Sequence, residues 1–194
     1  TLQRAIEYEN TLAYILLGYC FFQGDEPRAG KRYVEVAYAK GSGLAAWFLG
    51  HCYETGNGAS QDLLTAAKYY VIGYERRSAL AAIHLGRLYM SIDGGIAKAV
   101  ELFTSAHQKG FVQAHIELGK LCNKGMGVER DIQKAIKFHK LADASYYLSS
   151  TMSLGKYYSK SHDVQDKLKA ILFFLKILRH AKNQTSLKTT LHDL

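Results

Sequence analysis

The chain has 194 residues, enough for one or two domains, and 48% of them are hydrophobic, which excludes a disordered tail. A single proline excludes a proline-rich linker and suits a chain built of helices. The net charge of +8 lies mostly in residues 121–194, which carry 13 Lys/Arg against six Asp/Glu, so that this part either meets an acidic partner or presents a solvated lysine face.

The predicted elements are helices that pair into hairpins at a nearly constant spacing along the chain. Residues 1–8 read as the end of a helix from a preceding repeat, so we expect further repeats or another domain upstream. Five repeats of two helices follow, and a polar C-terminal tail or cap closes the chain at 182–194. The repeats span residues 9–40, 41–76, 77–109, 110–145 and 146–181.

Five Leu-Gly pairs mark the first helix of each repeat. A small residue stands five positions before each glycine, and an aromatic residue, or Cys122 in the fourth repeat, stands three positions after it. Positions −5, −1, 0 and +3 share one helical face, so we expect this face to pack closely on a neighbouring helix. The glycines, at spacings of 32, 36, 33 and 36 residues, are Gly18, Gly50, Gly86, Gly119 and Gly155.

A second helix follows the first in each repeat. The stretches "TAAKYYVIG" (65–73), "KAVELFTSA" (98–106), "KAIKFHKLA" (134–142) and "KAILFFLKI" (169–177) share an alanine with an aromatic residue or leucine three positions later. "AGKRYVEVA" (29–37) is a weaker copy. A lone hairpin cannot bury both apolar faces, so the hairpins must stack. The sequence therefore predicts an all-α fold, a right-handed α/α superhelix (solenoid) of about five helical hairpin repeats in one domain.

Two of these repeats resemble a known family. Residues 114–138, "AHIELGKLCNKGMGVERDIQKAIKF", and 45–69, "AAWFLGHCYETGNGASQDLLTAAKY", are similar to the Sel-1-like repeats, relatives of the tetratricopeptide repeats. The departures in the first are Cys122 for a tyrosine and Phe138 for a tryptophan. The resemblance covers residues 9–181. It implies a solenoid that assembles proteins, in roles such as adaptor, membrane-protein quality control or bacterial host interaction.

Gly125 and Gly127 precede a lysine-rich helix and so resemble a phosphate-binding loop. Gly56 and Gly58 occupy the same positions in the second repeat, however, and the chain contains no G-x-x-x-x-G-K-[ST] string. We therefore interpret both pairs as turns that end a helix at a positive φ. An aspartate after each pair is placed to cap the next helix: Asp62 and Asp131.

The reactive residue types form no recognised constellation. Three cysteines, Cys20, Cys52 and Cys122, are too few and odd in number for a disulfide framework, which favours a reducing, cytoplasmic location. The chain contains no H-E-x-x-H, no G-x-S-x-G and no run of the ~20 apolar residues that a membrane span needs. We expect no catalytic residue, no metal site and no cofactor.

The first helices also predict a binding surface. Helical geometry turns positions −6, −2, +1 and +5 toward the concave face of a solenoid, and this stripe changes from apolar and aromatic to basic along the chain. Its leucines, Leu12, Leu44 and Leu80, either pack between helices or take part in binding. The residues predicted to contact a partner are Tyr19, Phe48, His51, His84, Arg87, Lys120, Lys124 and Lys156.

These observations favour a non-enzymatic scaffold or adaptor that binds a partner protein or peptide, with apolar and acidic segments, in the concave groove. The alternative is a regulatory or targeting repeat domain of a larger enzyme, such as a kinase, whose catalytic part lies outside this chain. Nucleic acid is disfavoured because the lysines are not interleaved with aromatics as a base-stacking platform. The oligomeric state stays open.

Overall fold

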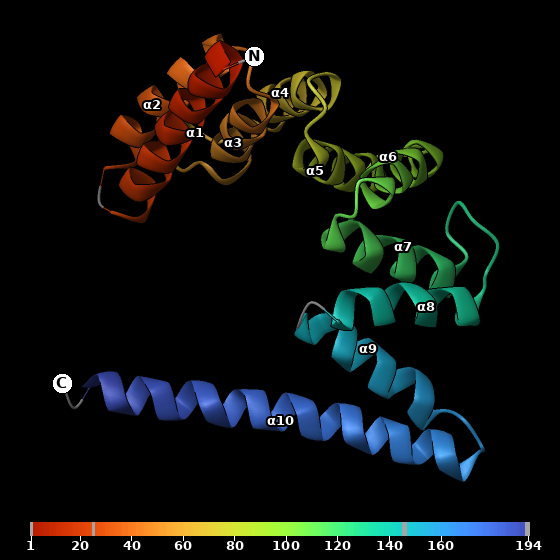
Figure 1. Ribbon diagram of the computed structural model, residues 1–194. Coiled ribbons are helices and arrows are strands. Elements are labelled where there is room, and N and C mark those ends of the chain that lie inside the picture. Colours follow the sequence, from red (N-terminus) through yellow and green to blue (C-terminus); the bar gives the residue numbers. More distant parts are fainter. Residues whose placement is uncertain (1, 25, 145–146, 193–194) are drawn as a thin grey trace. The chain divides into compact units, whose positions relative to one another are not determined.

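The computed structural model describes the backbone of residues 2–24, 26–144 and 147–192, and the side chains of residues 10–24, 26–144 and 147–181. Within these ranges all regular secondary structure is α-helical (Figure 1). The helices are α1 (Leu2–Gln23), α2 (Pro27–Ala39), α3 (Gly43–Thr55), α4 (Leu63–Glu75), α5 (Ala79–Met90), α6 (Ile96–Gln108), α7 (Val112–Lys124), α8 (Ile132–Asp143), α9 (Leu148–Ser159) and α10 (Val164–His192).

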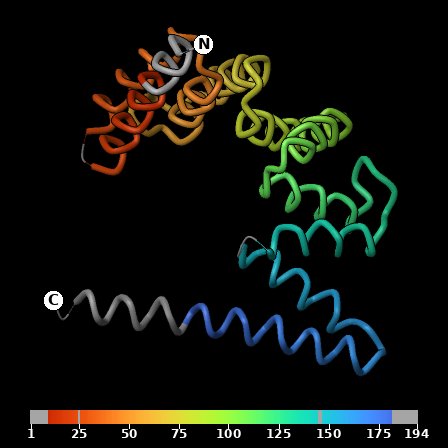
Figure 2. Tube along the Cα trace, viewed as in Figure 1, coloured from red at the N-terminus to blue at the C-terminus, as the bar shows by residue number. Residues whose placement is uncertain are grey.

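The helices pack as consecutive hairpins, which can be followed along the trace in Figure 2. The chain divides into unit 1, residues 1–109 with α1 to α6, and unit 2, residues 110–194 with α7 to α10. In unit 1 the hairpins are α1–α2, α3–α4 and α5–α6, with further contacts of α2 with α3 and of α4 with α5. In unit 2 the hairpins α7–α8 and α9–α10 meet through α8 and α9.

The turns inside two hairpins end one helix and start the next as the sequence predicts. Gly56 follows α3 at φ 76° and Gly125 follows α7 at φ 69°, both in the left-handed region that favours glycine. The Asp62 carboxylate accepts backbone N–H bonds at the start of α4, and the Asp131 carboxylate accepts one from Lys134 at 2.8 Å at the start of α8. These glycines and aspartates are therefore the elbow of a hairpin, and this prediction is confirmed.

A ring seated on a glycine forms the centre of the four later hairpins. The glycine lies in the first helix and the ring four residues after the buried alanine of the second helix. A methyl group built on each glycine would approach the ring to 2.6–2.7 Å, closer than any real contact. This close approach explains why the repeat demands glycine at that position. The pairs are Gly50 with Tyr70, Gly86 with Phe103, Gly119 with His139 and Gly155 with Phe174.

In three of the hairpins a second contact joins the two helices, between one aromatic ring of each helix. The aromatic residue three positions after the glycine stacks flat on a ring of the second helix, and these side chains are half-buried. Such stacked pairs add specificity to the apolar area that they bury. The pairs are Phe21 with Tyr33 (5.2 Å between ring centroids), Tyr53 with Tyr69 (5.6 Å) and Tyr158 with Phe173 (5.8 Å).

The first hairpin departs from the predicted frame. The boundary predicted between residues 8 and 9 lies inside α1, which runs unbroken from Leu2 to Gln23. Ala13 and Leu17 hold positions that are buried in the later hairpins, yet Leu17 is 47% exposed whereas its equivalent Leu49 is fully buried. α3, α5 and α9 each pack against the helix before them, and among the described residues no helix precedes α1.

The last hairpin departs through the length and surface of its second helix. α10 continues through His192, past the predicted boundary at residue 181, and the side chains of the predicted polar tail, 182–194, lie outside the described residues. Its exposed face is apolar where the equivalent face of α8 carries Gln133, Lys137 and Lys140. No helix in the described part of the chain combines the length and hydropathy that crossing a membrane requires. The exposed apolar residues of α10 are Val164, Leu168, Ile171, Leu172, Leu175 and Leu178.

Candidate functional site

The first helices of three successive hairpins in unit 1 bring a set of rings together. On α3, Trp47 stacks on His51 one turn later, with ring centroids 5.8 Å apart and planes 9° apart. Trp47 also meets His84 of α5 edge-on at 5.7 Å, and the neighbouring Phe48 meets Tyr19 of α1 edge-on at 6.4 Å. We call these five residues the aromatic row, and it runs without a break from α1 through α3 to α5.

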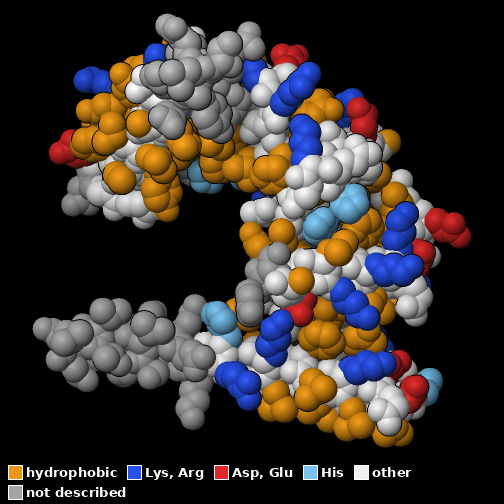
Figure 3. Space-filling model, in the orientation of Figure 1, with side chains coloured by type: hydrophobic (Ala, Val, Ile, Leu, Met, Phe, Trp, Pro, Cys, Tyr) orange, Lys and Arg blue, Asp and Glu red, His pale blue; other side chains and the backbone are white. Residues whose placement is uncertain are grey.

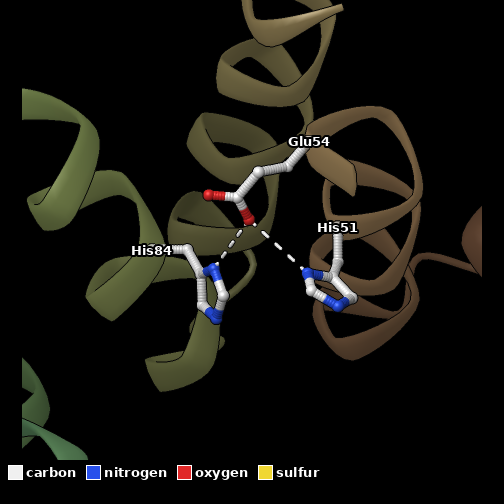
Figure 4. Close-up of side chains that lie close together, drawn as sticks. All are labelled: His51, Glu54 and His84. Carbon is white, nitrogen blue, oxygen red and sulfur yellow. Dashed lines mark hydrogen bonds and ion pairs between the residues drawn. The ribbon is translucent and has the colours of Figure 1, made fainter. Parts of the chain in front are cut away.

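One carboxylate lies at the α5 end of the aromatic row, where both histidines point toward it (Figure 4). Glu54 Oε2 is 3.5 Å from His51 Nδ1 and 3.1 Å from His84 Nδ1. The same oxygen accepts a hydrogen bond of 2.6 Å from the hydroxyl of Tyr70, which reaches it from α4. We call His51, Glu54 and His84 the α3–α5 cluster. The buried hydroxyl of Tyr70 holds the carboxylate of this cluster in place by its hydrogen bond.

The environment sets the protonation of this cluster. Burial acts to raise the pKa of the Glu54 carboxyl, but the hydrogen bond from Tyr70 and the interaction with His84 outweigh it, and the pKa is lowered overall. Burial lowers the pKa of His84, and Arg87 lowers it further, against the opposing effect of Glu54. Burial and Glu54 raise the pKa of Tyr70. At neutral pH the cluster therefore holds a carboxylate, a neutral imidazole on α5 and a phenol that donates.

The residues predicted for the N-terminal half of the binding surface differ in how exposed they are. His51 and His84 lie together, with ring centroids 5.6 Å apart, and Arg87 is exposed on α5. Tyr19 is 51% exposed, as a binding residue should be. Phe48 was expected to face the groove, but it is only 8% exposed and packs in the core of unit 1 against Phe22 at 5.0 Å. Phe48 is therefore the buried member of the aromatic row, and it offers little surface to a partner.

The three predicted lysines belong to unit 2, and all are exposed: Lys120 and Lys124 on α7 and Lys156 on α9. Figure 3 shows lysine and arginine side chains on the face of this unit that is turned to the viewer. Lys120 Nζ lies 3.2 Å from the carboxylate of Glu117, whose own side chain is buried. Lys120 therefore neutralises a buried charge, which leaves Lys124 and Lys156 as the better candidates for an acidic partner.

The family follows from comparison with known proteins. The sequence model of the Sel1 repeat matches residues 11–42, 43–76 and 112–142, together half of the chain. The chain belongs to the Sel1 repeat family. Comparison with curated protein sequences gives no match.

Solved structures agree with this assignment at the level of the fold. A Sel1 repeat protein from Oxalobacter formigenes superposes with a TM-score of 0.76 at 22% identity, over 92% of this chain and 76% of that one. The protein c5321 of uropathogenic Escherichia coli, a protective antigen with an SLR fold, gives 0.72 at 23% identity over 92% of this chain. The present chain spans 40% of the length of c5321. The predicted all-α repeat fold is thus confirmed.

The structure also places at the site residues that the sequence did not predict. Trp47 and Glu54 were not among the predicted binding residues, although they flank His51 at −4 and +3 on the same helix and therefore share its face. Tyr70 was recognised only as part of the second-helix motif. Its hydroxyl lies beyond the ring that seats on Gly50, and that extra polar atom is the signal which distinguishes it from Phe103 and Phe174 in the same position.

Proposed function

We propose that this Sel1 repeat chain is a non-catalytic module that binds a partner protein or peptide through the inner face of unit 1. Sel1 repeats generally mediate protein–protein interaction, and proteins of this family are typically scaffolds. The observation that carries the proposal is the aromatic row, because it links three hairpins by ring contacts and ends in partly exposed side chains. Tyrosine, tryptophan and arginine are the residue types that most often dominate binding energy at interfaces.

The chemistry of the surface suggests the chemistry of the partner. Tyr19 at one end of the aromatic row offers exposed aromatic surface for an apolar side chain. Arg87 at the other end is exposed and positively charged, and it suits a carboxylate. In unit 2 the exposed Lys124 and Lys156 favour acidic residues in the same way. A polypeptide with an apolar segment and acidic residues fits these features best.

The two buried thiols, Cys52 and Cys122, are not suited to act as nucleophiles. Burial raises the pKa of Cys52 to about 12, and burial also raises the pKa of Cys122. Because the thiolate is the reactive form of cysteine, both residues stay inert thiols at neutral pH. They behave as small core residues, which agrees with their exposed fraction of 2%.

Quantitative affinity capture with site variants tests this function. The bait is the chain with Tyr19→Ala and Arg87→Glu, compared with the unchanged chain and with Arg28→Glu as a control. Arg28 is an exposed arginine on α2, so it carries the same change of charge in the same unit but away from the aromatic row. Partners that are lost from the double variant and kept by Arg28→Glu support the proposed surface. An unchanged set of partners in the double variant contradicts it.

A further inference from the structure

The α3–α5 cluster has the composition of a metal site. Two imidazole nitrogens and one carboxylate oxygen, from His51, His84 and Glu54, all lie within 4.8 Å of one another. Two histidines with one glutamate form a known ligand set for Zn²⁺ that leaves a coordination position open. His51 and Glu54 share one face of α3, and His84 reaches the same point from α5 (Figure 4). The three donors therefore come from two hairpins whose packing fixes where they meet.

The spacing of the donor atoms suits a small ion. Zn²⁺ bonds nitrogen and oxygen at about 2.0–2.2 Å, so two ligand atoms of a tetrahedral site lie about 3.3 Å apart. The two distances from Glu54 Oε2 to the imidazole nitrogens are 3.1 and 3.5 Å, on either side of that value. The third separation, between the ligand nitrogens of the two imidazoles, is within 4.8 Å. His51 is the ring best able to move, because its side chain is 43% exposed.

The surroundings of the cluster add the support that metal ligands usually have. A carboxylate that binds a metal is commonly held by a further hydrogen bond, and Tyr70 provides it to Glu54 at 2.6 Å. Trp47 stacks on the His51 ring and meets the His84 ring edge-on, so one indole contacts both imidazoles. The side chains of Glu54 and His84 remain 26% and 16% exposed, so an ion can enter from solvent.

We propose that His51, Glu54 and His84 bind one divalent transition-metal ion with the ligand preferences of Zn²⁺. Each residue supplies one atom: Nδ1 of His51, Oε2 of Glu54 and Nδ1 of His84. Water completes the coordination on the exposed side. The proposal does not depend on a protein partner, because the site is complete within unit 1. It differs from our expectation from the sequence, which was that the chain holds no metal site.

The glutamate also holds the cluster together through its own hydrogen bonds. Its Oε2 is the common acceptor for both imidazoles and for the Tyr70 hydroxyl. To bind an ion through Nδ1, each neutral imidazole carries its proton on Nε2, while the hydrogen bond from Tyr70 to Glu54 can remain. Arg87 lies three residues after His84 on α5, and its positive charge weakens the attraction for a cation and favours a negatively charged fourth ligand.

Isothermal titration of the chain with Zn²⁺ tests the site. The protein carries Cys20→Ser throughout and no affinity tag, because Cys20 is an exposed thiol that would bind zinc by itself. We expect one ion per chain. His51→Ala and Glu54→Gln should each weaken binding by more than about 100-fold, since the loss of an outer partner alone typically costs 10–100-fold. Circular dichroism and the melting temperature establish that both variants are folded.

Two further variants separate a metal site from a plain hydrogen-bonded cluster. Tyr70→Phe should lower zinc affinity by about 10–100-fold and keep the fold, because phenylalanine stands at the equivalent position in two other hairpins. His162→Ala removes an exposed histidine of unit 2 and should leave the affinity unchanged. No stoichiometric binding, or equal affinity in His51→Ala, Glu54→Gln and His162→Ala, overturns the proposal. A thiolate absorption band after Co²⁺ loading overturns it as well.

Discussion

His139 is the residue whose replacement tests the packing scheme most directly. It occupies the ring position of the α7–α8 hairpin, seated on Gly119 and 1% exposed, where the other later hairpins place Tyr70, Phe103 and Phe174. Burial, with a smaller effect of Lys120, lowers its pKa to about 4. Its Nε2 is buried without a hydrogen-bond partner, and its Nδ1 lies 3.4 Å from Ser150 Oγ. A phenylalanine should therefore fit this position at least as well.

The consequence for stability follows from the two pKa values of His139. The folded value of about 4 lies below the ~6.5 expected in the unfolded chain, so the unfolded state takes up the proton first as the pH falls. The contribution of His139 to the stability of the fold is therefore complete above about pH 6.5 and is lost progressively toward pH 4. At pH 5 the loss amounts to about 2 kcal/mol. Phenylalanine does not titrate, so this contribution should vanish in His139→Phe.

Urea unfolding at pH 7.5 and pH 5.0 measures the effect. The variant is His139→Phe with Ser150→Ala, because Ser150 loses its partner and alanine stands at the equivalent position before Gly86 and Gly119. Circular dichroism follows the transition, since the only tryptophan, Trp47, lies in unit 1. The stability lost between the two pH values should be about 2 kcal/mol smaller in the variant, whereas His162→Asn should behave like the parent. A loss as large as that of the parent refutes the reasoning.

Three further predictions concern packing and charge. Gly86→Ala places a methyl group 2.7 Å from the Phe103 ring, and such overpacking costs about 1–3 kcal/mol of stability. The helix preference of alanine offsets ~1 kcal/mol of this cost, so the midpoint of urea unfolding should fall. An unchanged midpoint would speak against the ring contact. Leu172→Lys changes a side chain that is 66% exposed on α10, and the melting temperature should correspond to less than about 0.5 kcal/mol of change. The double variant Lys124→Glu with Lys156→Glu should bind a captured acidic partner more weakly than the unchanged chain does. Its affinity should also depend less on salt, as measured by titration at two salt concentrations. Equal salt dependence in the variant and the unchanged chain would contradict the role of these lysines.

The fold could be predicted because its determinants are short-range and recur. A glycine that must accept a ring, such as Gly50 or Gly86, tolerates no other residue without strain, so it returns at each period and marks the hairpin. Asp62 and Asp131 were predictable for the same reason, since capping depends on residues two or three positions away. The course of α1 was not predictable in this way. Its residues near position 8 continue a helix, and no local signal marks a break.

The site was only partly predictable because it depends on contacts between hairpins. The helical positions placed His51 and His84 on the same face of the first helices, and the structure brings the two rings together. The same reasoning placed Phe48 on that face, yet Phe22 of the preceding hairpin helps to bury it, which a single helical wheel does not reveal. Glu54 was missed because its position, four after Gly50, falls between the selected positions. The side chain reaches the histidines by its length.

The ring seated on its glycine has a consequence for how such a chain can change in length. Both partners, for example Gly86 and Phe103, belong to the same hairpin. A duplication or deletion of a whole period, 33 to 36 residues here for the later hairpins, therefore leaves every such pair intact. A break point inside a period separates a glycine from the ring that packs on it. One hairpin is then left with a cavity above its glycine, and another with an aromatic ring that has no glycine to pack on. Recombination between repeats is thus tolerated in whole steps, and the number of hairpins can vary while each one keeps its own interior.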